Sequence, residues 1–214
     1  HPEGETVVLQ IIKEFKKIKY DRKTFIQNIE TLKKIKGIIF KNGDTIHKTA
    51  PGEIIKDLDF LPFPARDLFP MERYVPLPNQ YKRLPLTNMV VIRGCPYVCT
   101  FCDQAATIAR RRSPQKVIDE IKHCVENYGT REISFWDDTM SYHKKWMVEF
   151  CNLLIDAKLD LIWSCYAAIN TVNKEILELM AKAGCWNIFY GYETGVEVLA
   201  QNIKTNRKNR SMDY

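Results

Sequence analysis

From residue 86 onward the chain alternates short apolar segments with amphipathic ones, and this alternation limits the possible fold more than any other feature. Segments with the length and apolar content of buried strands lie at 88–93, 132–136, 161–166 and 187–191. Helical apolar spacing separates them near 114–127, 143–156 and 173–183, and a further helix begins near 195. Consecutive strand–helix units favour parallel strands with right-handed crossovers. The sequence therefore predicts an α/β fold built on a parallel sheet.

The first fifty residues follow a different pattern. Residues 6–18 place apolar side chains on one helical face and lysines on the other, which predicts an amphipathic helix. A weaker apolar pattern at 25–32 is typical of a shorter helix. Asn42-Gly43 lies between two short β-rich runs and predicts a hairpin, because this pair tolerates the positive φ angles of tight turns. Residues 1–50 are thus expected to form a small α+β unit.

Prolines crowd the segment 51–85, where they remove backbone donors and block regular structure. We therefore expect an extended linker that wraps over a surface. It would separate the unit at 1–50 from the strand–helix units at 86–214.

Three cysteines lie in one short turn-rich stretch, Gly94-Cys-Pro-Tyr-Val-Cys-Thr-Phe-Cys-Asp103. Cys95, Cys99 and Cys102 can hold three corners of an iron–sulfur cube and leave the fourth iron without a protein ligand. A closed zinc site needs a fourth ligand, for which Cys124 or His123 would be the first candidates, and a disulfide is a third alternative. The spacing favours the cluster. The single cysteines are expected to be small buried apolar residues, and they are Cys124, Cys151, Cys165 and Cys185.

Composition limits the class of protein and its compartment. The chain is 45% hydrophobic and 27% charged, which is typical of a soluble globular protein. Seven cysteines without regular pairing favour the reducing cytoplasm, and no apolar run is long enough to span a membrane. The formal charge of +6 comes largely from lysines at helical spacing, which favours solvated faces over a nucleic-acid surface. The run Arg110–Arg112 precedes a helix, where it is expected to be solvated, and the alternative is that it meets an anionic substrate or partner.

The cysteine motif resembles the signature of the radical S-adenosylmethionine (SAM) enzymes, because Cys-x-x-x-Cys-x-Phe-Cys directly follows an apolar strand. The resemblance implies a partial (βα)6 barrel, of which about four units fit in this chain. It also implies a [4Fe–4S] cluster on Cys95, Cys99 and Cys102, whose open iron chelates SAM. Reductive cleavage of SAM would give a 5′-deoxyadenosyl radical, with the electron supplied by a protein such as flavodoxin or ferredoxin.

In parallel βα folds, ligands gather at the carboxyl ends of the strands. The second strand ends at Asp137-Asp138, where the family has a Gly-Gly-Glu-like segment that contacts the SAM amino group. A carboxylate suits an ammonium there, although an ordinary helix-capping turn explains the same residues. The fourth strand ends in Gly191-Tyr-Glu-Thr-Gly195, similar to the family's Gly-x-Glu-Ser-Gly. Gly191 and Glu193 are therefore further candidates for SAM contacts. No catalytic side chain is assigned.

The hairpin and the segment Asp59-Phe-Leu-Pro-Phe-Pro-Ala-Arg-Asp67 resemble the bridge after the cobalamin domain in cobalamin-binding radical SAM proteins. Residues 1–50 would then be the end of that domain. Cobalamin is implied only for a longer parent, because Asp44-Thr-Ile-His47 does not match the Asp-x-His-x-x-Gly motif. We expect methyl transfer or oxidative cyclisation of an unknown small molecule, and no turnover by residues 1–214 alone. The alternatives are a methylthiotransferase acting on tRNA or a ribosomal protein, and a non-enzymatic electron-transfer or zinc module.

Overall fold

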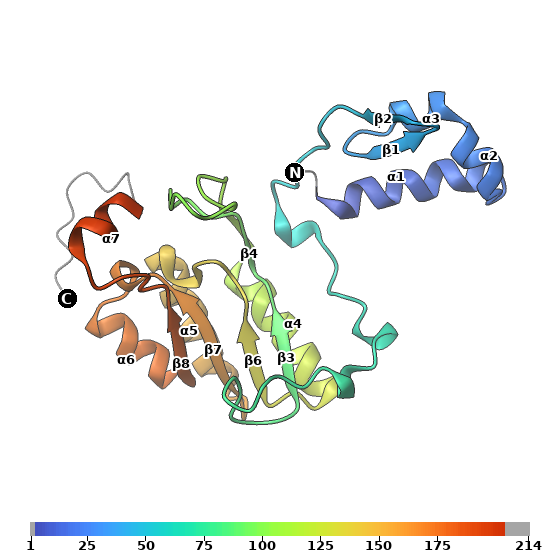
Figure 1. Cartoon of the computed structure of the whole chain (residues 1–214). Coiled ribbons are helices and arrows are strands. Elements are labelled where there is room, and N and C mark those ends of the chain that lie inside the picture. The colour runs from blue at the N-terminus through green and yellow to red at the C-terminus, as the bar shows by residue number, and fades with distance from the viewer. Residues whose placement is uncertain (1–2, 204–214) are drawn as a thin grey trace. The chain divides into compact units, whose positions relative to one another are not determined.

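The computed structural model describes residues 3–203, which fall into two compact units with a boundary between Lys56 and Asp57 (Figure 1). Most of the proline-rich segment 51–85 thus belongs to the second unit. No helix among these described residues is both long and apolar enough to cross a membrane.

The first unit is a small α+β structure. Its elements are α1 (Gly4–Lys17), α2 (Arg22–Gln27), α3 (Ile29–Lys34), β1 (Ile39–Asn42) and β2 (Thr45–Lys48). The predicted amphipathic helix and the hairpin are confirmed, with Asn42 opposite Thr45 across the turn and Gly43 at φ +57°. The shorter predicted helix is two helices. Asn28 ends the first, and its side chain accepts a hydrogen bond from Thr31 N at the start of the second.

The second unit contains a four-stranded parallel sheet in the order β3-β6-β7-β8, which confirms the predicted α/β fold. Its strands are β3 (Leu86–Met89), β6 (Glu132–Phe135), β7 (Ile162–Ala167) and β8 (Cys185–Tyr190). Helices follow the cysteine loop and each later strand, namely α4 (Pro114–Tyr128), α5 (Lys144–Ala157), α6 (Lys174–Lys182) and α7 (Glu197–Ile203). Figure 1 shows α4, α5 and α6 stacked against one face of the sheet.

The main hydrophobic core lies between this sheet face and the three helices. Phe135 of β6 packs edge-to-face against Phe150 of α5 and Trp163 of β7, with ring centroids 5.6 and 5.8 Å apart. All three side chains are fully buried, and burying one such ring stabilises a fold by about 1.5–3 kcal/mol. The single cysteines join this core as predicted, because Cys124, Cys151 and Cys165 are fully buried and Cys185 is half-buried.

The first predicted strand is interrupted. The parallel ladder ends at Met89, and after two residues β4 (Ile92–Arg93) pairs instead with β5 (Arg110–Arg111) in an antiparallel two-stranded sheet. The cysteine loop connects β4 to β5. A single continuous strand at 88–93 was therefore a wrong prediction, and the reason is a carboxylate that binds the intervening backbone, described below.

The proline-rich segment is anchored to α4 by polar contacts. It forms three short 3₁₀ turns at Leu58–Phe60, Arg66–Leu68 and Met71–Arg73. Asp59 Oδ1 accepts a hydrogen bond of 2.9 Å from Ser113 N, at the start of α4. Arg66, only 6% exposed, forms an ion pair of 2.6 Å with Glu120 of the same helix.

Glu120 also binds Arg112, which is 6% exposed. The prediction of a solvated arginine run is therefore wrong at Arg112, because its guanidinium serves as a buried counter-charge. Arg111 is half-buried, and its Nη1 donates a 2.7 Å hydrogen bond to Tyr142 Oη.

Candidate active site at the carboxyl edge of the sheet

The cysteine loop spans residues 94–109 and is closed by its own backbone. Thr107 N donates to Cys95 O at 3.0 Å, and Ala106 N donates to Tyr97 O at 2.7 Å. Gly94 opens the loop at φ +87°, where a Cβ would lie 2.4 Å from Ile108 O. Only glycine fits this position, because the two ends of the loop pass too close for a side chain.

The three loop cysteines are free thiols of graded exposure. Cys95 is 9% exposed, Cys99 and Cys102 are half-buried, and Cys102 N donates to Cys99 O at 3.2 Å in a tight turn. Burial raises the pKa of the Cys95 thiol. A bound metal would lower that pKa, because ligation takes place through the thiolate.

This donor set fits an iron–sulfur cluster. Three thiols on one compact loop can each reach a different iron of a cube. Within residues 3–203, no three His, Cys, Asp or Glu side chains lie close enough to hold a single metal ion. Neither suggested fourth zinc ligand completes a site, since Cys124 is fully buried in the core and His123 Nδ1 lies 3.0 Å from Asn127 Nδ2.

Asp137 follows β6 and binds the backbone at the interruption of the first strand. Its Oδ1 accepts hydrogen bonds from Val91 N at 2.7 Å and Ile92 N at 2.6 Å. The side chain is only 2% exposed, and Oδ2 has no hydrogen-bond partner among the described residues. Burial raises the pKa of Asp137 to about 7, although the two backbone donors oppose the shift. Asp137 thus holds the chain segment that leads into the cysteine loop.

Asp138 has an exposed side chain and lies near the loop, where its charge interacts with Cys95 and Asp103. The partial loss of hydration around its carboxylate raises its pKa, and the negative charge of Asp103 raises it further. The charge of Asp138 also contributes to the raised pKa of Cys95. Two carboxylates therefore lie near the cysteine loop, where they produce a negative potential that favours a cationic group.

Glu193 lies just past the end of β8, in a left-handed conformation with φ +67°. Its carboxylate folds back over Gly191, where an added Cβ would lie 2.7 Å from Glu193 Oε1. Gly191 is therefore needed for this close approach. Left-handed backbone in residues other than glycine is costly and occurs often at functional sites.

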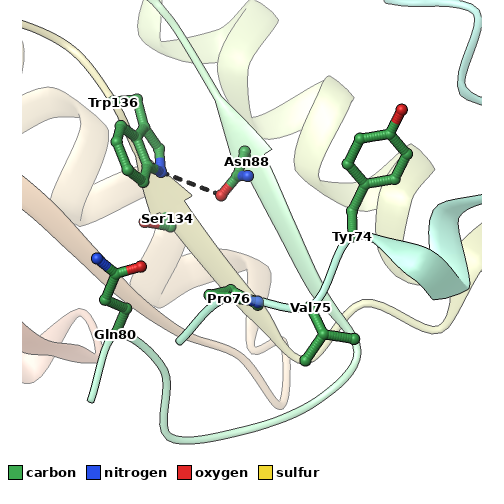
Figure 2. Close-up of a pocket in the computed structure, with 7 residues that line it drawn as sticks. All are labelled: Tyr74, Val75, Pro76, Gln80, Asn88, Ser134 and Trp136. Carbon is green, nitrogen blue, oxygen red and sulfur yellow. Dashed lines mark hydrogen bonds between the residues drawn. The ribbon is translucent and has the colours of Figure 1, made fainter. Parts of the chain in front are cut away.

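The sheet order places these residues along one edge. The four strands are parallel, so Asp137, Asp138, Gly191 and Glu193 all follow carboxyl ends at the edge where the cysteine loop leaves β3 and β4. A further set of residues was missed in the sequence, namely Asn88, Ser134 and Trp136, which line a pocket on the sheet face away from the helices (Figure 2). A signal was available, because Ser134 and Trp136 alternate with apolar residues and Asn88 interrupts another apolar segment.

Comparison with known proteins gives the family of this architecture. The model of the radical SAM superfamily matches residues 89–213. An uncharacterised methyltransferase of Pyrococcus horikoshii is 30% identical over 76% of this chain and 35% of its own length. The anaerobic magnesium-protoporphyrin IX monomethyl ester cyclase of Cereibacter sphaeroides is 31% identical over 92% of this chain and 31% of its own. The chain thus spans about a third of the length of these relatives.

Solved structures share the fold. The cobalamin-dependent SAM radical enzyme OxsB superposes on 95% of this chain and 29% of its own, with a TM-score of 0.69 and 16% identity. The radical SAM methyltransferase TsrM of Kitasatospora setae covers 59% of this chain and 26% of its own, with a TM-score of 0.54 and 19% identity. The partial barrel expected from the cysteine motif is confirmed by these superpositions.

Proposed function

Because this chain belongs to the radical SAM superfamily, we propose that it is part of an iron–sulfur enzyme that cleaves S-adenosylmethionine reductively. The observation that carries the proposal is the compact loop 94–109, with three free thiols at the carboxyl edge of a parallel sheet. When bound, a [4Fe–4S] cluster supplies the electron that breaks a carbon–sulfur bond of SAM, which yields methionine and a 5′-deoxyadenosyl radical.

Cys95, Cys99 and Cys102 would each ligate one iron and leave the fourth open to the amino and carboxylate groups of SAM. Asp138 is the better placed of the acidic pair for the SAM ammonium, because it is exposed beside the loop while Asp137 Oδ1 is occupied by backbone donors. Glu193 is a second candidate, as the only carboxylate in the Gly191–Gly195 turn.

The relatives favour the cobalamin-dependent branch of the family. Two curated relatives are a methyltransferase and an oxidative cyclase, and two superposed structures are radical SAM proteins solved with cobalamin. These matches favour methyl transfer or cyclisation of a small molecule over a methylthiotransferase. The sequence itself contains no Asp-x-His-x-x-Gly motif, so cobalamin would bind to another part of a longer parent protein. Residues 1–50 would then be the end of its cobalamin domain.

The cluster would need an external electron. We propose a small electron-transfer protein such as flavodoxin or ferredoxin as the partner. The formal charge of +6 supports a carrier with a negative surface, because complementary charge speeds encounter between proteins.

Anaerobic iron–sulfur reconstitution of the full-length protein that contains this sequence tests the proposal. We expect about four irons per chain and broad visible absorbance from a cube on three thiolates. Cys99→Ala should lose both, whereas the matched variant Cys185→Ala, outside the loop, should retain them. Stoichiometric zinc without iron, or equal iron in both variants, would contradict the assignment.

A further inference from the structure

The sheet face away from the helices carries a polar layer one residue deep. Asn88 of β3 is opposite Ser134 of β6, Ser134 is opposite Ser164 of β7, and Ser164 is opposite Asn187 of β8. Each of the four strands thus contributes one neutral polar residue at the same level. Ser164 Oγ donates to Ser134 Oγ at 3.4 Å, and both serines are buried. Core packing does not require the two buried serines, because apolar side chains would bury there at less cost.

An aromatic row lies one level nearer the carboxyl edge. The Trp136 and Tyr166 ring centroids are 5.6 Å apart, and Tyr166 stacks on Phe189 at 5.0 Å with an interplanar angle of 25°. Trp136 is 48% exposed despite its size. The row therefore presents a partly open aromatic surface directly above the polar layer, and Trp136 immediately precedes the acidic pair beside the cysteine loop.

A pocket of about 170 Å³ joins the two levels. Its sheet side is formed by Asn88, Ser134 and Trp136, and its opposite wall by the segment 74–80, including Gln80 (Figure 2). Trp136 Nε1 donates a 3.1 Å hydrogen bond to Asn88 Oδ1, which fixes the indole over the pocket. For comparison, an apolar cavity of about 150 Å³ holds a benzene ring, so this pocket has room for about one ring.

The pocket offers neutral hydrogen-bonding groups that no protein partner uses. The Asn88 Nδ2 group and the side-chain amide of Gln80 make no hydrogen bond within residues 3–203. The nearest carboxylate along β6 is Glu132, and it is already satisfied. Its oxygens accept from Lys82 N at 2.8 Å, Arg83 N at 2.7 Å and Trp186 Nε1 at 2.9 Å. No charged side chain of the described part of the chain lines the pocket, so it suits an uncharged ligand.

We propose that this pocket binds the substrate of the radical reaction through an uncharged planar ring with a hydrogen-bonding edge, that is, a heteroaromatic group. The face of the ring packs on Trp136, since aromatic rings prefer offset or edge-on contacts with each other. Its polar edge meets Asn88 and Gln80. Binding of a ring at this pocket does not depend on the proposed function. The identification of that ring as part of the substrate does rest on it, because the pocket lies next to the edge where the radical would form.

Binding of small probe rings tests the inference directly. Indole carries a ring N–H donor, and indene has nearly the same shape without it. Saturation-transfer NMR on the full-length protein, with and without the reconstituted cluster, measures both affinities even when they are weak. We expect indole to bind about tenfold more tightly than indene, the effect of one hydrogen bond.

Two variants and one control locate the site. The indole N–H needs an acceptor, and the amide oxygen that the described pocket residues leave free is that of Gln80, since Asn88 Oδ1 already accepts from Trp136 Nε1. Gln80→Leu should therefore weaken indole binding about tenfold and abolish the preference over indene, while the control Asn152→Leu on the exposed face of α5 should change neither. Trp136→Leu should weaken the binding of both probes, because it removes the aromatic face. Circular dichroism and iron content check that each variant is folded and loaded. Equal affinity for indole and indene, or equal effects of Gln80→Leu and Asn152→Leu, would overturn the proposal.

The two proposals can fail separately. If the wild-type protein takes up no iron but still prefers indole through Gln80, the radical SAM assignment fails and the ring pocket stands. If iron is bound normally and indole shows no preference, the pocket assignment fails and the cluster stands.

Discussion

Replacing Glu120 with glutamine should destabilise the second unit more than any surface substitution on the same helix. Glu120 is 2% exposed and is the counter-charge of two buried arginines, Arg66 and Arg112. Three guanidinium nitrogens of this pair already lack a hydrogen-bond partner within the described residues. The triad therefore has a buried net charge of +1, which the substitution raises to +2.

The size of the effect follows from the contacts. Each charge-assisted hydrogen bond to Glu120 contributes about 1.5–3 kcal/mol, and removing one partner from a buried ion pair costs about 3–5 kcal/mol. Glutamine keeps one oxygen acceptor, so we expect a loss of about 3–4 kcal/mol. At about 2–4 °C per kcal/mol for a unit of this size, the unfolding midpoint should fall by roughly 6–16 °C.

Thermal unfolding followed by circular dichroism measures the shift, with Glu126→Gln on the exposed side of α4 as the matched control. Replacing Arg66, Arg112 and Glu120 together with methionine should recover most of the loss, because no buried charge remains. If Glu120→Gln shifts the midpoint no more than Glu126→Gln does, the buried triad does not anchor the proline-rich segment to α4 and the reasoning fails.

Three further outcomes follow from the site and its surroundings. Burial raises the pKa of Asp137 to about 7, so the folded protein favours the protonated carboxyl. The free energy of unfolding of the wild type, measured with urea, should therefore fall relative to that of Asp137→Asn as the pH rises from about 4 to 7. Gly94→Ala should abolish iron uptake, whereas Gly129→Ala, equally left-handed but facing open space, should lower only stability. Hydrogen bonding to Arg83 lowers the pKa of Asp160 to about 2. The loss of unfolding free energy in Asp160→Asn relative to the wild type should therefore be complete above about pH 4 and vanish toward pH 2. A loss that does not change with pH would refute the pairing.

The strand–helix alternation predicted most of the second unit because each segment carries its own local signal. Ser113-Pro114 is an example, since the serine side chain caps α4 and the proline occupies its first turn. The break after Met89 carried no such signal. It depends on Asp137, 46 residues further along the chain, whose carboxylate binds Val91 N. A contact over that distance is set by the packing of β6 beside β3.

The candidate site was predicted in part for the same reason. The cysteine spacing is local and was readable, whereas the role of each carboxylate depended on its surroundings. Asp137 and Asp138 are adjacent and chemically identical, yet one is buried against backbone amides and the other is exposed beside the loop. The buried role of Arg112 was hidden in the same way, because its partner Glu120 lies 8 residues further along the chain, on the buried side of α4.

Alternate residues of each strand face opposite sides of the sheet and are therefore subject to different selection, one set for stability and the other for ligand binding. Over β6 and the residue that follows it, Ile133 and Phe135 pack into the core, while Ser134 and Trp136 line the pocket. A change at the first pair alters stability, and a change at the second alters what the pocket accepts. Relatives that share this barrel can therefore diverge in substrate by varying the pocket-facing residues while the core-facing residues stay constant. We expect a saturation library of residues 133–136 to show tolerance that alternates with a period of two.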